Sequence, residues 1–146
     1  MGPTSSRFTV AVHILALLAI EAKDQPTTSD YLARSARTNP VVIRRILAQL
    51  GNANLLIAQP GTHGGVKLAR PAAQINLREV YQAVEKGAIF SFGSRENNPH
   101  CICGRSLEPV MTKVFHHAEQ ALEDALAQMT VAELAAEIEA VDAERH

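Results

Sequence analysis

The chain has 146 residues, 47% of them hydrophobic, which suits one ordinary globular domain that can bury a core. Four Phe, two Tyr and no Trp exclude the aromatic platforms on which unpaired bases stack. The net charge is −1, but residues 1–78 carry nine Lys/Arg and three Asp/Glu (+6), and residues 79–146 carry five and twelve (−7). The first half can therefore attract phosphates, and the acidic half is expected to point away from nucleic acid.

The first expected element is an apolar helix over residues 6–21. Its apolar run is too short to span a membrane, and no other segment is a better candidate, so we predict no membrane contact. His13 is interpreted as a histidine packed on this helix with one nitrogen hydrogen-bonded. Because the helix is apolar nearly all round, we expect it to pack within or between subunits.

Two short helices separated by a turn come next. Thr28 or Ser29 can cap a helix that ends at Ala36. Asn39 can cap a second helix with Pro40 at its first position, where the missing amide proton costs nothing. Such a pair is the helix-turn-helix arrangement, whose second helix enters the major groove of DNA.

The second helix, over about residues 40–51, has two different faces. At about 100° per residue its inward face is apolar and its outward face carries two arginines. Alone, this pattern would indicate a core helix with a solvated outer side, but the neighbouring elements favour DNA reading. We expect a phosphate contact from at least one arginine, although either could also bind guanine. The inward residues are Ile43, Ile46, Leu47 and Leu50, and the outward residues are Val41, Arg44, Arg45 and Ala48.

A β-hairpin is predicted after the second helix. Residues 55–58 and 66–69 are strand-like, and the seven residues between them include Gly61, Gly64 and Gly65. These glycines would permit close approach to a phosphate chain, with His63 and Lys67 as nearby donors. A hairpin that binds nothing is the alternative for this stretch alone. Together with the helix pair, it predicts a winged helix-turn-helix.

The acidic half is expected to be helical. Asn76 and Glu79 form a capping-box pattern that starts a helix ending near Gly87, and Thr130 and Glu133 form another before a final helix. Between them we predict a loop over residues 88–105 and a long helix over about 106–128. The apolar stripe of the long helix indicates either an intramolecular core or a dimer seam. Its members are Leu107, Val110, Met111, Val114, Phe115, Ala118, Ala121, Leu122, Ala125 and Met129.

The predicted fold is therefore mostly α with a small β-hairpin wing. Residues 1–87 would form the DNA-binding domain, with the first helix shared with a dimer core. Residues 88–105 would form a candidate sensor loop, and residues 106–146 the dimerisation and C-terminal helices.

Several segments resemble the Rrf2 family of bacterial winged-helix repressors: SRFTVAVHIL (6–15), TSDYLA (28–33), NPVVIRRIL (39–47) and LREVYQAV (77–84). The NPVV and NPHC (98–101) motifs resemble its YwnA-like branch, whose members are not known to bind a cluster. This resemblance implies a cytoplasmic homodimer that binds palindromic double-stranded operators, with the wing near the minor groove. It implies DNA contacts from Ser29, Val41, Arg44, Arg45, His63, Gly64 and Lys67, to which we add the adjoining Thr28, Asn39, Pro40 and Gly65.

Metal binding is one interpretation of the two cysteines, Cys101 and Cys103. Cluster-binding relatives supply three cysteines in this region, so two disfavour an iron-sulfur cluster. A zinc site could combine them with His100 and either His116 or His117, but structural zinc sites usually show two separated ligand pairs. We therefore expect no bound metal or other cofactor.

A thiol sensor is the favoured functional interpretation, because His100, Arg105 and a nearby helix start could each stabilise a thiolate at Cys101 or Cys103. A bond to the other subunit or a mixed disulfide would be less strained than a Cys-x-Cys ring. Two reduced cysteines without a sensing role remain the default interpretation.

No enzyme is expected. The chain lacks a nucleophile with a base, a carboxylate pair and a phosphate-binding glycine loop, and His116 and His117 are adjacent and face different directions. A winged helix that serves as a protein-interaction adaptor stays open, because fold does not determine function. Strong salt dependence of duplex binding would favour the regulator.

Overall fold

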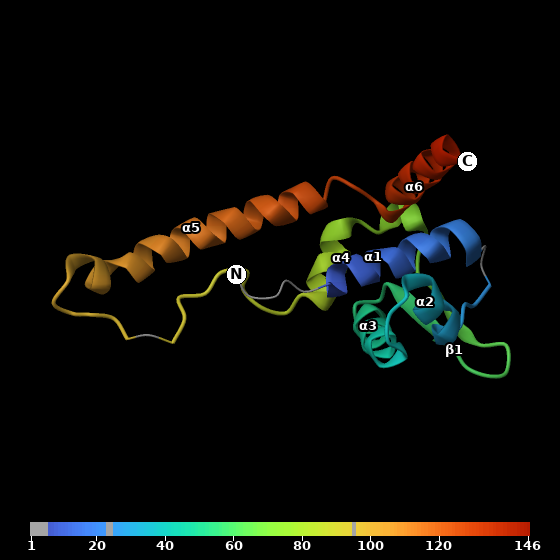
Figure 1. The fold of residues 1–146 in the computed structure, drawn as a ribbon, viewed down its shortest axis with the longest axis horizontal. Helices are drawn as coiled ribbons and strands as arrows, with labels where there is room; N and C mark the ends of the chain where they lie inside the picture. The colour runs from blue at the N-terminus through green and yellow to red at the C-terminus, as the bar shows by residue number, and fades with distance from the viewer. Residues whose placement is uncertain (1–5, 23–24, 95) are drawn as a thin grey trace.

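The computed structural model describes residues 6–22, 25–94 and 96–146 and arranges them as a helical body with a long projecting arm (Figure 1). The body contains α1 (Arg7–Leu17), its π-helical continuation η1 (Leu18–Ala22), α2 (Ser29–Ala36), α3 (Pro40–Asn52), β1 (Leu56–Gln59), β2 (Gly65–Leu68), the 3-10 turn η2 (Ala72–Gln74) and α4 (Leu77–Val84). The arm is α5 (Ile102–Leu126), and α6 (Val131–Arg145) lies back on the body. The predicted mostly helical fold with one antiparallel hairpin is confirmed.

The helix starts that capping residues predicted are confirmed, and each is fixed by a hydrogen bond. Of the two candidates at the start of α2, Thr28 is the cap. A side-chain cap of this kind stabilises a helix by about 1 kcal/mol. The amide donors and their acceptors are Tyr31 to Thr28 Oγ1 (3.2 Å), Val41 to Asn39 Oδ1 (2.7 Å), Glu79 to Asn76 Oδ1 (3.0 Å) and Glu133 to Thr130 Oγ1 (3.1 Å).

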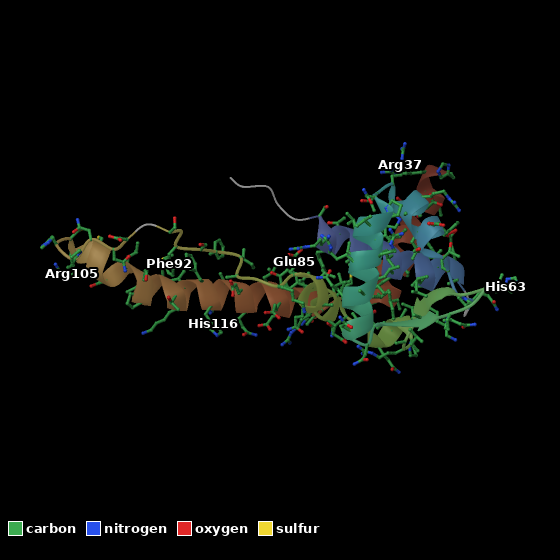
Figure 2. All side chains as sticks on the ribbon, turned by 90° about the horizontal axis from the view of Figure 1, so that it is seen from below. Arg37, His63, Glu85, Phe92, Arg105 and His116 are labelled. Carbon is green, nitrogen blue, oxygen red and sulfur yellow. The ribbon has the colours of Figure 1, made fainter. Side chains whose placement is uncertain are left out.

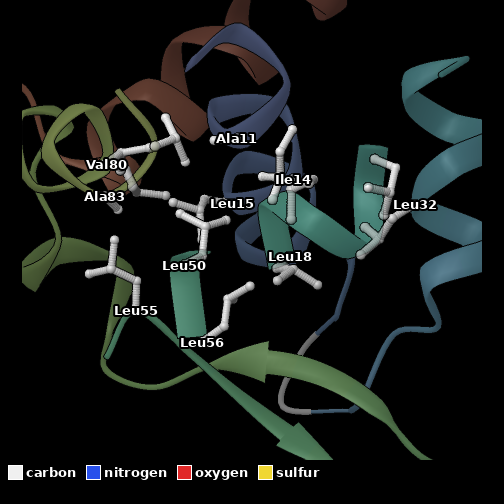
Figure 3. Packing of buried hydrophobic residues seen from close by; sticks show 14 of the residues in the cluster. Ala11, Ile14, Leu15, Leu18, Leu32, Leu50, Leu55, Leu56, Val80 and Ala83 are labelled. Carbon is white, nitrogen blue, oxygen red and sulfur yellow. The ribbon is translucent and has the colours of Figure 1, made fainter. Parts of the chain in front are cut away.

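The hydrophobic core lies where α1 contacts α2, α3, α4 and α6 (Figure 3). The inward face predicted for α3 is confirmed, with Leu47 half-buried and the other three members buried. His13 points out of this core, and its Nε2 lies 2.9 Å from Ser35 Oγ, as predicted for a histidine with one satisfied nitrogen. The side chains that are fully buried are Ile14, Leu15, Leu32, Ile43, Ile46, Leu50, Leu55, Ile75, Val80, Val84 and Val131.

The predicted start of the long helix at about residue 106 is wrong by one turn, because α5 begins at Ile102. Asn98 explains the difference: a Cβ at Gly104 would lie 2.3 Å from its carbonyl oxygen, so only glycine allows the preceding loop to pack so closely on this turn. Arg105 Nη1 also donates to the carbonyl of Pro99 at 3.2 Å. These contacts make Cys101 the N-cap residue of α5. The helix α4, in turn, ends at Val84 rather than near Gly87.

The segment before α5 runs back along this helix and covers one of its faces (Figure 2). Phe115 stacks on Phe90 with ring centroids 4.8 Å apart and meets Phe92 at 5.4 Å. The backbone amide of Ile89 donates to Glu119 Oε1 at 3.1 Å. The C-terminal part of α5 also contacts α4, through Gln82 and Arg78 against Glu123, and the rest of its surface is uncovered. None of its residues is buried. None of the described helices is long and apolar enough to cross a membrane.

Candidate DNA-binding surface

The outward face of α3 is exposed on the side of the body opposite α6 (Figure 1). Arg44, Arg45 and Ala48 are exposed, and Val41 exposes 53% of its surface. In the described part of the chain, neither arginine has a salt bridge or a side-chain hydrogen bond. Both guanidinium groups are therefore available to a ligand that approaches this face.

The other candidate residues of α2 and α3 hold these helices in position and do not project from the surface. The hydroxyl of Thr28 and the side-chain oxygen of Asn39 already accept amide protons as helix caps. Ser29 is half-buried in the first turn of α2, and Pro40 is exposed at the first turn of α3. These residues fix the direction in which α3 presents its outward face, and their contact with DNA stays a prediction.

The hairpin lies on the same side of the body as α3, with His63 at its exposed tip (Figures 1 and 2). Gly64 follows in the tip, where its amide donates to the carbonyl of Gly61 at 3.0 Å. Lys67 lies half-buried within β2, opposite Ile57 of β1. The structure therefore places His63 farthest out and Lys67 nearer the body.

Gly65 has a structural role that the sequence reasoning missed. Its φ is +155°, and a Cβ there would lie 2.3 Å from the carbonyl oxygen of Thr27. Thr27 and Val66 exchange two backbone hydrogen bonds, of 2.9 and 2.8 Å, which tie β2 to the residue before the cap of α2. A glycine at the start of a strand can signal such close backbone approach.

The candidate sensor residues lie at the far end of the arm, where Figure 2 labels Arg105. The backbone amides of Gly104 and Cys103, at the start of α5, lower the pKa of the exposed Cys101 thiol below its ordinary value, although no hydrogen bond caps the helix at this side chain. The helix start thus stabilises the thiolate, as expected. His100 and Arg105 are not among the causes of this lowered pKa. The Arg105 guanidinium instead donates to the carbonyl of Pro99.

A cavity of about 260 Å³ opens beside the second cysteine. Cys103 lies in the first turn of α5 and is exposed. The cavity walls come from this turn and from the segment that precedes the helix, namely Phe92, Glu96, Asn97, Asn98, Gly104, Leu107 and Glu108. A small oxidant or thiol therefore has open access to this end of the arm.

The structure does not assemble the side chains considered for zinc. His116 lies thirteen positions after Cys103 on α5, which corresponds to about 20 Å along the helix. Among the described residues, no three His, Cys, Asp or Glu side chains gather in a way that could hold a metal ion. Two thiols alone also fall short of the four ligands that an iron-sulfur cluster usually takes.

The capped helix pair with its exposed arginines, and the hairpin beside it, define a winged helix-turn-helix protein. Residues 4–137 match the family model described as "Rrf2: Iron-dependent Transcriptional regulator", and the chain belongs to this Rrf2 family. That description names iron dependence. This chain has two cysteines, both exposed near the start of α5, and among the described residues no three His, Cys, Asp or Glu side chains gather in a way that could hold a metal ion.

Comparison with individual relatives agrees with this assignment. The chain is 37% identical over 128 residues to YwnA of Bacillus subtilis, which is named as an HTH-type transcriptional regulator; the match covers 87% of this chain and 92% of YwnA. It is 33% identical to YwgB of the same organism, over 71% and 68% of the two chains. A regulator structure from Lactobacillus plantarum is 27% identical with a TM-score of 0.78, over 92% and 90% of the chains. These relatives are transcriptional regulators, not enzymes.

Proposed function

We propose that this protein is a homodimeric transcriptional repressor that binds a palindromic operator in the cytoplasm and carries no cofactor. The observation that supports it most directly is the outward face of α3, which leaves Arg44 and Arg45 exposed and unpaired in the described structure. A helix with such a face fits the major groove, and its arginines suit guanine edges or phosphates.

In this proposal the hairpin follows the DNA backbone beside the groove that α3 enters. His63 lies at the tip and can reach farthest, and Lys67 adds a positive charge nearer the body. Gly64 leaves the tip backbone free of a Cβ where it folds against the carbonyl of Gln59. Contacts of this kind fix the orientation of a protein on the duplex and supply much of its affinity.

Dimerisation through α5 is supported by its uncovered apolar face. Val110 and Val114 expose 59% and 49% of their surface, and Leu107 exposes 43%. With the exposed Ala118, Ala121 and Ala125, these residues form a continuous stripe along the helix, here called the α5 stripe. A stripe of this length on a soluble protein indicates a surface that another helix covers.

Charge favours an antiparallel pair of α5 helices. Residues 102–114 carry two basic side chains and one acidic, and residues 115–126 carry three acidic side chains and neither Lys nor Arg. Antiparallel packing brings the basic half of each helix against the acidic half of its partner, and parallel packing would bring the two acidic halves together. The tip of each arm then lies near the body of the other subunit.

Thiol chemistry at Cys101 is the signal that we infer for this regulator. The backbone amides at the start of α5 lower the pKa of its thiol, which favours the reactive thiolate, and Cys103 lies two residues away beside an open cavity. Modification at this end of the arm would displace the start of α5 and so change the spacing of the two reading helices.

The deciding experiment is a fluorescence-anisotropy titration against duplexes that tile the region upstream of the gene, with competitor DNA at two salt concentrations. We expect tight, salt-dependent binding to one palindromic duplex. Replacing Arg44→Ala together with Arg45→Ala should weaken it by about 1 to 3 kcal/mol for each arginine that binds a base edge or a phosphate well.

The matched control is the pair Lys86→Ala and Arg145→Ala, which removes the same charge from exposed positions after α4 and in α6 and should leave operator binding nearly unchanged. Unaltered affinity in the Arg44 and Arg45 variant would place the reading face elsewhere. A wild-type protein that is indifferent to every duplex would instead favour the protein-interaction adaptor.

A further inference from the structure

Besides Arg44 and Arg45, two arginines beside α3 differ in their surroundings from the arginines of the body that form ion pairs. Arg7 forms an ion pair with Glu85, and Arg70 and Arg78 likewise pair with glutamates. Arg34 and Arg37 are both exposed and, within residues 6–22, 25–94 and 96–146, form neither an ion pair nor a side-chain hydrogen bond. Their charges are thus not neutralised by the protein.

Arg37 also occupies a backbone conformation that its side chain disfavours. It follows the last residue of α2 with φ 51° and ψ 47°, the left-handed region in which glycine is the default. The side chain confers no visible structural gain there, and Figure 2 shows it pointing outward from the edge of the body. A side chain at a strained position without a structural partner suggests a role in binding.

Both arginines lie beside the start of α3. With Thr38, Asn39 and Pro40 they line a shallow hollow of about 460 Å³, which Asp30 borders on the α2 side. The amide of Arg37 donates to the carbonyl of Arg34 at 3.2 Å, so the two residues are adjacent. They therefore flank the end of α3 that leads into the DNA groove in a helix-turn-helix complex.

We propose that Arg34 and Arg37 extend the DNA interface beyond α3 and the hairpin by contacting backbone phosphates along one edge of the major groove. The inference rests on the proposed DNA binding by α3. Phosphate contacts position a protein without reading sequence, so these arginines contribute affinity equally for operator and non-specific duplex.

The test measures how operator affinity depends on salt. Each phosphate contact contributes about 0.9 to the steepness of log K against log salt, and a substitution removes one contact from each subunit of the dimer. The steepness should therefore fall by about 1.8, which corresponds to about sixtyfold weaker binding at 0.1 M salt. We expect this change for Arg37→Gly, with the ratio of operator to non-specific affinity unchanged. Because glycine relieves the left-handed strain, Tm should stay constant or rise by about 2 °C. Arg37→Lys should keep the slope, and Arg34→Ala should lower it.

Asn54→Gly is the matched control, because Asn54 is uncharged and also left-handed with φ 62°. It should keep the wild-type salt slope. If Arg37→Gly binds like the wild type and the Arg44 and Arg45 variant does not, the extended interface is wrong and the proposed function stands. If the wild-type protein binds no duplex, the proposed function itself fails.

Discussion

At the scale of single residues, the sulfur of Cys101 shows how a helix start can set the chemistry of a side chain. The first amides of a helix have no intrahelical acceptor, and here those of Gly104 and Cys103 are the main cause of the lowered pKa of the Cys101 thiol. They stabilise the negative charge of the thiolate and so lower the pKa. Reactivity at this position therefore depends on α5 being folded as far as Ile102.

The pH dependence of alkylation tests this account. Because the pKa of Cys101 is lowered, its thiolate is present at lower pH than an ordinary thiol. Iodoacetamide should modify Cys103→Ser, which keeps Cys101, with a rate profile whose midpoint lies below that of the unfolded protein. If Cys101 is the sensor, Cys101→Ser should also lose any response of operator affinity to oxidant. Coincident profiles for folded and unfolded protein would contradict the helix-start effect.

At the scale of elements, the hairpin is held by the residue that precedes the cap of α2 as well as by its own strands. Thr27 pairs with Val66, and Gly65 allows the two backbones to approach. An isolated two-stranded hairpin is marginally stable, so this added pairing fixes its direction relative to α2.

Gly65→Ala tests how much the pairing of Thr27 with Val66 stabilises the hairpin. An added Cβ would overlap the Thr27 carbonyl, so we expect the free energy of unfolding to fall by more than about 1 kcal/mol. Chemical denaturation measures this, and operator affinity should fall as well. Gly51→Ala is the control: a Cβ there meets nothing within 4 Å, and alanine favours the helix, so it should be neutral or slightly stabilising.

The elements differ in how far the sequence predicts them. Helix starts that depend on a local side chain, as at Asn39 and Asn76, follow from the sequence because donor and acceptor lie two or three residues apart. The start of α5 does not, because it depends on Asn98 packing against Gly104 across a turn.

The residues of the candidate DNA-binding surface also differ in whether the sequence predicts their role. Helical periodicity predicts which residues of α3 face outward, since it needs no tertiary information. It does not reveal that Gly65 meets Thr27, because the pairing joins segments distant in sequence. Nor does it reveal the left-handed conformation of Arg37, a position where glycine would be expected.

At the scale of the whole molecule, the arm has more apolar surface than one chain covers. The segment before α5 covers the face that carries Phe115, and the α5 stripe stays exposed. In the antiparallel pair, the cysteines of the two subunits would lie at opposite ends of the seam, about 35 Å apart. Oxidation should therefore yield mixed disulfides rather than a bond between the two α5 helices.

Sedimentation equilibrium tests whether the α5 stripe joins two subunits. Val110→Glu together with Val114→Glu would bury unpaired charges between the two α5 stripes, so we expect the dimer to dissociate into monomers with unchanged helix content. Thr112→Glu together with His116→Glu places the same two charges on the opposite side of α5, where both residues are exposed, and should leave the dimer intact. A dimer that survives the valine substitutions would mean that another surface joins the subunits.

The backbone pairing between Thr27 and Val66 also constrains how such a regulator could be switched. Since it joins the hairpin to the start of α2, and the turn at Arg37 joins α2 to α3, the three elements form one rigid block. Within one subunit, the distance between the major-groove contacts of α3 and the DNA-backbone contacts of the hairpin is then constant. A signal at the arm can change only the distance or angle between two such blocks, so loss of repression should appear as a mismatch with operator spacing while each half-site is still recognised.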